Sequence, residues 1–349
     1  MKTAVVILNW NTERYLKDFL PDLVASCPAD AGIIVADNGS DDGSLALMAR
    51  EFPAVKTISL DANYGFTGGY NRALAQVDAE YFLLLNSDIQ VAPGWLEPLV
   101  EYMDSHPECG ACGPKLHALV RSLDGGYERL DRFEYAGAAG GRIDRLGYPF
   151  CRGRVMQRVE EDMGQYDAPS DLLWVSGACL LTRASLWREL GGLDERFFAH
   201  MEEIDYCWRA QLKGWTVAVV PESVVWHLGG GTLVPKSPWK LELNHRNNLL
   251  LLENNLPATV GTTRARVRII VRQLLDLGSA FVYMLSGRPE DFRAVIRAHR
   301  GYRNLRREAP ACRSGRAEIK GYINNFIILQ SLLRGGGIFR YLKRYEDSH

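Results

Sequence analysis

The chain has no long hydrophobic run. None of its 349 residues lies in an apolar stretch of roughly 18 or more, so no membrane-spanning helix is expected. Residues 4–8 are the only apolar run before Asn9, which is too short for a signal peptide. The chain also contains no internal repeat and no low-complexity segment. This composition is typical of a soluble globular protein with one large domain, or with one domain and an appendage.

The cysteines follow no pairing pattern. Their number, seven, is odd, and no spacing between them repeats. Cys109 and Cys112 form a lone CxxC motif, and no second pair exists to complete a zinc site. We therefore expect reduced thiols in a cytosolic protein.

Charge is balanced over the whole chain but not along it. The chain has 41 basic and 42 acidic residues, yet from Lys240 onward there are 20 basic and 9 acidic ones, a net charge of +11. The preceding residues carry a net charge of −12. This asymmetry predicts two parts, an acidic domain over 1–238 and a basic helical region over 239–349. A basic region can face anionic lipid, nucleic acid or the acidic domain of the same chain.

Short apolar runs that end in polar residues dominate the first part. The run 81–85 has no polar alternation, as expected for a strand buried on both faces, and ends in Asn86, Ser87 and Asp88. Similar runs end at Asn9 and at Asp37. Because helical patterns separate these runs, the sequence predicts an α/β fold with a mostly parallel sheet. Ligands bind at the carboxyl ends of the strands in such sheets.

The patterns in the remainder of the chain are less regular. Residues 117–170 contain many glycines, and we expect an irregular, functional segment there. Helices are expected over 265–285 and 290–307. The apolar face expected for the first of these consists of Val267, Ile270, Leu274, Leu277, Phe281 and Leu285. This face can lie on a membrane surface, form a dimer interface or pack within the chain, and the sequence leaves the three open.

Several polar residues at strand ends suggest chemistry. Asp88 can hold a hard divalent cation, with a nucleotide diphosphate supplying further oxygens, and His227 can add a nitrogen ligand. Asp37 can accept from the imide N–H of a uracil or thymine base. Each residue also has a structural interpretation, an aspartate opening a turn or a histidine ending a strand.

Two further features are weaker alone. The glycine-bearing loop 63–71 allows close approach to a ligand, although it lacks a P-loop lysine and is not GxGxxG. Glu202, Glu203 and Asp205 place three carboxylates within four residues. Such a cluster is either a solvated helix start or part of a site.

Taken together, these motifs resemble those of a known protein family. Asn9-Trp10-Asn11, residues 37–44, Asn63-Tyr64-Gly65-Phe66, Asn86-Ser87-Asp88, Ser176-Gly177-Ala178 and Glu202-Glu203-Ile204-Asp205 occur in that order. Over residues 3 to about 250 the chain resembles the inverting glycosyltransferases of family 2 with the GT-A fold, especially rhamnosyltransferase-like members. The resemblance implies a GT-A catalytic domain with a C-terminal helical appendage, and transfer of a sugar from a nucleoside diphosphate donor with Mg²⁺ or Mn²⁺.

The resemblance also implies roles for individual residues. Glu203 would be the catalytic base, with Asp205 as the alternative, and Asp88 and His227 would bind the metal. Gly177 and Glu202 would lie on the acceptor side. We also expect Trp174 there, because aromatic faces suit the C–H surfaces of sugars, although Trp174 can equally be a core residue. The residues implied in nucleotide binding are Asn9, Asn11, Asp37, Asn63, Gly65 and Asn86.

Two positions depart from the family pattern. Asn86 stands where the DxD motif has its first aspartate, and Glu203 stands where the base is usually aspartate. By resemblance the donor is a dTDP- or UDP-sugar, rhamnose being favoured, and the acceptor is a glycan or a lipid-linked glycan. We expect no nucleic-acid partner, and a cytoplasmic location that includes the inner face of the membrane. Two rival interpretations are a sugar-phosphate nucleotidyltransferase and a silent nucleotide-sugar-binding module.

Overall fold

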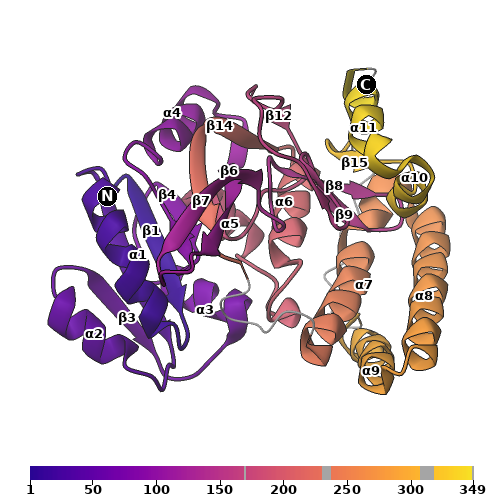
Figure 1. Ribbon diagram of the computed structural model, residues 1–349, viewed down its shortest axis with the longest axis horizontal. Helices are drawn as coiled ribbons and strands as arrows, with labels where there is room; N and C mark the ends of the chain where they lie inside the picture. The colour runs from indigo at the N-terminus through magenta and orange to yellow at the C-terminus, as the bar shows by residue number, and fades with distance from the viewer. Residues whose placement is uncertain (169, 230–236, 307–317, 348–349) are drawn as a thin grey trace.

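A ten-stranded mixed sheet forms the centre of the molecule (Figure 1). The computed structural model describes residues 1–168, 170–229, 237–306 and 318–347. The strand order is β12-β14-β6-β13-β4-β1-β2-β3, with β5 pairing with β14 and β7 with β6. The strands are β1 (Thr3–Asn9), β2 (Ala31–Asn38), β3 (Lys56–Leu60), β4 (Tyr81–Leu85), β5 (Ile89–Gln90), β6 (Cys109–Arg121), β7 (Tyr127–Phe133), β12 (Ser170–Asp171), β13 (Cys179–Arg183) and β14 (Thr216–His227).

The parallel part of the sheet gathers the polar strand ends. Strand β1 pairs in parallel with both β2 and β4, and Asn9 lies directly opposite Asp37. The residues that follow β4 therefore lie at the same edge. The predicted α/β fold is confirmed, and the sheet is mixed because β13 runs antiparallel to both β4 and β6.

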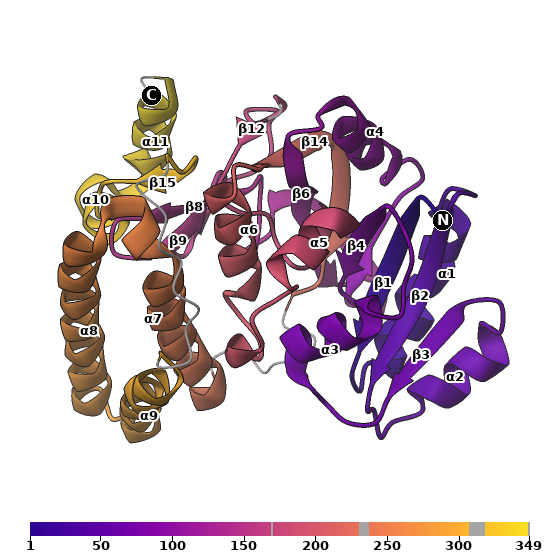
Figure 2. The same cartoon turned by 180° about the vertical axis from the view of Figure 1, so that it is seen from behind.

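Helices cover both faces of the sheet (Figures 1 and 2). Apolar side chains of α1, α2 and α4 share one core with one face, and those of α3, α5 and α6 share another core with the opposite face. These elements are α1 (Glu13–Ser26), α2 (Ser44–Glu51), α3 (Gly65–Leu74), α4 (Glu97–Ser105), α5 (Ala184–Leu190), the 3-10 turn η1 (Glu195–Phe197) and α6 (Glu202–Leu212).

Two expectations about local structure were wrong. Helix α3 begins at Gly65, so most of the predicted glycine loop is the first part of a helix. Residues 117–170 are not irregular, because the end of β6, the strand β7 and most of a second, five-stranded sheet lie there. That sheet has the order β11-β10-β9-β8-β15, and its strands are β8 (Gly141–Asp144), β9 (Pro149–Cys151), β10 (Arg154–Val155), β11 (Arg158–Val159) and β15 (Tyr322–Ile323).

The C-terminal part is helical, as predicted. In both views α7, α8 and α9 lie at the end of the molecule remote from β1–β3, and α10 lies near the upper end of α8. The helices are α7 (Pro238–Val260), α8 (Thr262–Leu285), α9 (Pro289–Leu305), α10 (Ile327–Arg334) and α11 (Ile338–Asp347). Within the four described ranges, no helix combines the length and the apolar character needed to cross a bilayer.

Candidate active site

The ends of β1 and β2 are joined by a buried polar network. Asp37 is 1 % exposed, and its two carboxylate oxygens accept from Asn9 Nδ2 at 2.8 Å and from the Ser40 backbone N–H at 3.0 Å. Asn11 Nδ2 donates to Asp41 Oδ1 at 2.6 Å, nearer to solvent. A carboxylate has about four acceptor positions, so Asp37 retains capacity for a further N–H group. The network holds two strand ends in place, and the base contact of Asp37 stays a prediction.

The start of α3 closes this edge. Asn63 Oδ1 accepts from Asn38 Nδ2 at 3.1 Å and from the Gly65 N–H at 2.8 Å. Gly65 has φ of +70°, and a Cβ there would lie 2.5 Å from the Phe198 ring. The Phe198 carbonyl accepts from the Phe66 N–H at 2.7 Å. Only glycine fits this position, because any side chain would separate α3 from the loop before α6.

Beyond β4, a histidine lies between two carboxylates. His227 Nε2 is 3.2 Å from Asp88 Oδ1, and His227 Nδ1 is 3.5 Å from Glu134 Oε2. All three side chains are buried. Burial lowers the pKa of His227, but Asp88 and Glu134 outweigh this effect and raise it well above its usual value. Two buried carboxylates thus create a site that attracts positive charge.

The geometry of Asp88 and His227 fits a divalent cation. Two neighbouring ligands of an octahedral ion, each about 2.1 Å from it, lie ~3.0 Å apart, which is close to the 3.2 Å between Asp88 Oδ1 and His227 Nε2. Metal-bound histidines usually donate their other N–H to a carboxylate, and Glu134 is in that position. Among the described residues, no three His, Cys, Asp or Glu side chains converge on one point. These two residues would therefore need oxygens from a ligand to complete the coordination.

Two adjacent glutamates begin α6. Each has a buried Oε2 atom without a hydrogen-bond partner among the described residues. Burial raises the pKa of Glu203 to about 7, and burial together with the Glu203 charge raises that of Glu202 well above its usual range. A Cβ on Gly177 would lie 3.4 Å from Glu203 Cβ, and the neighbouring Ala178 carbonyl accepts from the Asn86 N–H at 2.9 Å. Glu203 is thus a carboxylate near the end of β4 that can accept a proton near neutral pH.

Asp205 lies in a different environment. It is fully buried, and its Oδ2 accepts from Arg209 Nε at 2.6 Å. Its Oδ1 accepts from Asn254 Nδ2 at 2.9 Å and from Asn255 Nδ2 at 2.8 Å. Both oxygens of Asp205 are therefore already occupied by donors from its own helix and from α7. The structure therefore argues against Asp205 as the catalytic base and shows it joining α6 to α7.

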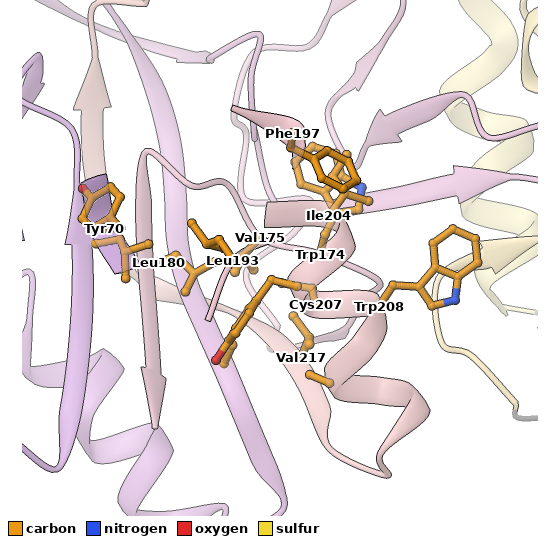
Figure 3. Close-up of a cluster of buried hydrophobic side chains, with 14 of the residues drawn as sticks. Tyr70, Trp174, Val175, Leu180, Leu193, Phe197, Ile204, Cys207, Trp208 and Val217 are labelled. Atoms are coloured by element: carbon orange, nitrogen blue, oxygen red, sulfur yellow. The ribbon is translucent and has the colours of Figure 1, made fainter. Parts of the chain in front are cut away.

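Trp174 packs in the core, as one of the two interpretations left open by the sequence expects. It is 4 % exposed, and its indole Nε1–H donates to the Arg142 carbonyl at 3.1 Å. Figure 3 shows it in the same apolar cluster as Phe197 and Ile204. Because Trp174 is buried and its indole N–H already has an acceptor, we interpret it as a packing residue.

Glu134 was missed by the sequence analysis. It follows β7, in the segment expected to be irregular, and 93 positions separate it from His227. No short motif could link residues so far apart.

The six described cysteines are unpaired, and burial raises the pKa of Cys109 to about 12. Cys312 lies outside the described residues.

Both the sequence and the fold of this chain are similar to those of known proteins. Residues 4–151 match the model of glycosyl transferase family 2. The chain is similar to the N-acetylglucosaminyl-diphospho-decaprenol L-rhamnosyltransferase of Mycobacterium tuberculosis, with 29 % identity over 293 residues, 79 % of this chain and 91 % of that protein. It is also similar to rhamnosyltransferase WbbL of Escherichia coli, with 26 % identity over 62 % of this chain and 80 % of that protein. The solved structure of GalNAc-T7 with UDP, GalNAc and Mn²⁺ has the same fold, with a TM-score of 0.56 and 18 % identity over 73 % of this chain and 48 % of that one.

Proposed function

We propose a reaction for this chain on the premise that it is a family 2 glycosyltransferase that uses nucleotide sugars and is similar to rhamnosyltransferases. The reaction is transfer of a rhamnose-like sugar from a dTDP- or UDP-linked donor to a hydroxyl of a lipid-linked glycan, with inversion. The mycobacterial relative is named for an acceptor of this class, a saccharide on a decaprenyl diphosphate.

The observation that carries the proposal is the environment of Glu203. Its Oε2 is buried without a partner among the described residues, and its pKa is raised to about 7, whereas the nearby Asp205 is already paired. In our proposal Glu203 removes the proton from the acceptor hydroxyl. The oxygen then attacks the anomeric carbon from the side opposite the diphosphate, so that one bond forms as the other breaks. The departing nucleoside diphosphate carries away the electron pair, and the configuration inverts.

Asp88 and His227 are proposed to hold a divalent cation, Mg²⁺ or Mn²⁺. When bound, such an ion would neutralise charge that develops on the leaving diphosphate. The GalNAc-T7 structure contains Mn²⁺ together with UDP. Glu134 would fix the imidazole so that Nε2 points towards Asp88. Gly177 and Glu202 remain proposed for the acceptor side.

The polar strand ends are proposed to bind the nucleotide. Asp37 would accept from the imide N–H of the base, and Asn9 and Asn11 would position the loop that contains it. Gly65 lets the start of α3 approach the donor, next to Asn63, and Asn86 lies where the diphosphate is expected. A lipid-linked acceptor implies work at the inner face of a membrane, and we propose a peripheral contact there.

A panel of nucleotide sugars tests the proposal. Purified protein with Mn²⁺ should release nucleoside diphosphate from a dTDP- or UDP-sugar in the presence of a saccharide diphosphate acceptor. A nucleotidyltransferase would release pyrophosphate, and a binding module would bind donor without releasing either. Pyrophosphate, or saturable donor binding without turnover across the panel, would contradict the proposed function.

A further inference from the structure

Helix α8 buries charged side chains and exposes apolar ones. Its buried face includes Arg272 and Asp276, together with Ala265, Ile269 and Ala280. Its exposed face carries the apolar stripe Val267, Ile270, Leu274, Leu277, Phe281 and Leu285, whose members are 42–72 % exposed. In a water-soluble protein the apolar stripe of a helix normally faces the core. This stripe, which we call the α8 stripe, faces outward.

A polar anchor fixes this orientation. Arg272 Nε lies 2.9 Å from Asp276 Oδ1, and Arg272 Nη1 donates to the Leu146 carbonyl at 3.3 Å. His245 Nδ1 of α7 is 3.1 Å from Asp276 Oδ1, and His299 Nε2 of α9 is 3.6 Å from Asp276 Oδ2. Rotating α8 to bury its stripe would expose or unpair these charges, which is costly. The outward stripe is therefore a fixed feature of the three-helix arrangement.

Helix α10 also exposes apolar side chains. Leu329, Leu332 and Leu333 of α10 are 46–72 % exposed, and both views show α10 near the upper end of α8. Contiguous exposed patches larger than a few hundred Å² usually mark an interaction surface. The stripe also lies on the outermost helix of the molecule, at the end remote from β1–β3.

Charge decides which occupant fits. The exposed charged residues of α8 itself, Arg264 and Arg266, are both basic. Beyond the helix, Arg288 and Arg334 are exposed as well, and Arg288 pairs with Asp291. A second copy bound through the same surface would bring the same basic residues towards these ones. An anionic lipid surface instead supplies the opposite charge, together with an apolar layer for the stripe.

We infer that the α8 stripe docks the enzyme on an anionic membrane, with α8 lying in the interface plane. The stripe spans 19 residues, which corresponds to ~28 Å of helix, long enough to rest along a bilayer surface. This inference rests on the proposed function, because it gives a lipid-linked acceptor a surface from which to reach the enzyme. It assigns that surface to particular residues far from the catalytic carboxylates.

Vesicle flotation with the full chain tests the inference. We expect binding to phosphatidylcholine vesicles that contain phosphatidylglycerol, and much weaker binding to phosphatidylcholine alone. Leu274→Glu should weaken binding at least about tenfold, because one leucine leaves the apolar layer and a charge is added. Leu123→Glu makes the same chemical change at a fully exposed turn residue and should bind within about twofold of wild type. Replacing Arg264 and Arg266 by Gln should cost about fivefold for each arginine, on anionic vesicles only.

Two controls separate membrane docking from misfolding and from dimer formation. Leu274 is exposed, so Leu274→Glu should keep the wild-type circular dichroism spectrum, melting temperature and donor turnover measured without vesicles. Loss of vesicle binding with intact turnover therefore concerns the surface and not the proposed reaction. Equal vesicle binding by Leu274→Glu and wild type, or no binding by wild type, would overturn the inference. A wild-type dimer in light scattering that Leu274→Glu dissociates, without vesicle binding, would assign the stripe to a second copy.

Discussion

Replacing Glu203 by glutamine tests the catalytic core of the proposal. The amide keeps the size of the side chain but cannot accept a proton from the acceptor hydroxyl. Loss of a general base typically reduces the rate about 10²- to 10⁴-fold, or about 3–5 kcal/mol of transition-state stabilisation. Donor binding should change little, because the nucleotide is expected at the ends of β1, β2 and β4. Glu222→Gln, at an exposed glutamate of β14, is a matched control.

The pH dependence gives the same hypothesis a second readout. Burial raises the pKa of Glu203 to about 7, and only the ionised form acts as a base. The ratio kcat/KM of the wild type should therefore be constant above that pH and fall about tenfold per unit below it. The residual activity of Glu203→Gln should lack this ionisation.

Stability should change in the opposite direction to activity. The folded-state pKa of Glu203, about 7, lies above the ordinary glutamate value, so the neutral form is favoured by folding. The stabilisation that neutral Glu203 gives to the folded state is fully present at acidic pH and is lost as the pH rises through 7. At pH 8 the glutamine variant should therefore melt at a higher temperature than wild type, with a gain of up to about 3 kcal/mol.

Reaction rates and melting curves of the wild type, Glu203→Gln and the control Glu222→Gln test this role of Glu203. Donor turnover can be followed by nucleoside diphosphate release, and donor binding by calorimetry. A Glu203→Gln rate within tenfold of wild type, or a flat wild-type profile between about pH 5 and 8, would refute Glu203 as the base. A crippled Asp205→Asn with a nearly normal Glu203→Gln would show that the wrong carboxylate was chosen.

Three further changes probe the surroundings of the base. Asp88→Ala should reduce turnover at least about a thousandfold, because it removes the carboxylate ligand proposed for the metal; turnover within tenfold of wild type would remove Asp88 from the mechanism. Glu134→Gln should weaken Mn²⁺ binding, measured by electron paramagnetic resonance, about 10- to 100-fold, whereas the exposed Asp131→Asn should leave it unchanged. Asp205→Asn should lower the free energy of unfolding by about 3 kcal/mol because it breaks the buried pair with Arg209, and an unchanged denaturant midpoint would contradict the structural role.

The strand ends were predictable because buried strands have a strong local pattern. The run that became β4 is apolar at every position, and its pairing with β1 brings Asn86 and Asp88 to the edge that also holds Asn9 and Asp37. The second sheet was not predictable, since its strands are short and interrupted by glycines. Strand β15 pairs with β8 across more than 170 positions of sequence, a contact that no local pattern contains. Glu134 was missed for the same reason.

The orientation of α8 could not be predicted from its sequence pattern. Its amphipathic pattern correctly predicted a helix and the residues of its apolar face. The pattern does not say which face is buried, and the usual assumption would have placed the α8 stripe inside. Arg272 and Asp276 decide otherwise, because their partners His245 and His299 lie on neighbouring helices. Only the three-dimensional arrangement shows that the charged residues pack and the apolar ones do not.

The helical region also supports α6, the helix that contains the proposed base Glu203. Phe198, His200 and Met201, just before α6, have φ of +65°, +71° and +73°, a conformation that costs energy in non-glycine residues. Asn247 Nδ2 of α7 lies 2.7–2.9 Å from the carbonyl oxygens of Phe197, Ala199 and His200.

A chain ending before α7 would lose this support, and with it the two asparagines that hold Asp205 in α6. Glu203 lies in the same helix, two positions before Asp205, so its placement depends on the same contacts. Truncation would therefore remove the α8 stripe and disturb the candidate active site together. Point variants on the exposed α8 stripe leave Asn247 and Asp205 in place, and for that reason they can separate docking from catalysis.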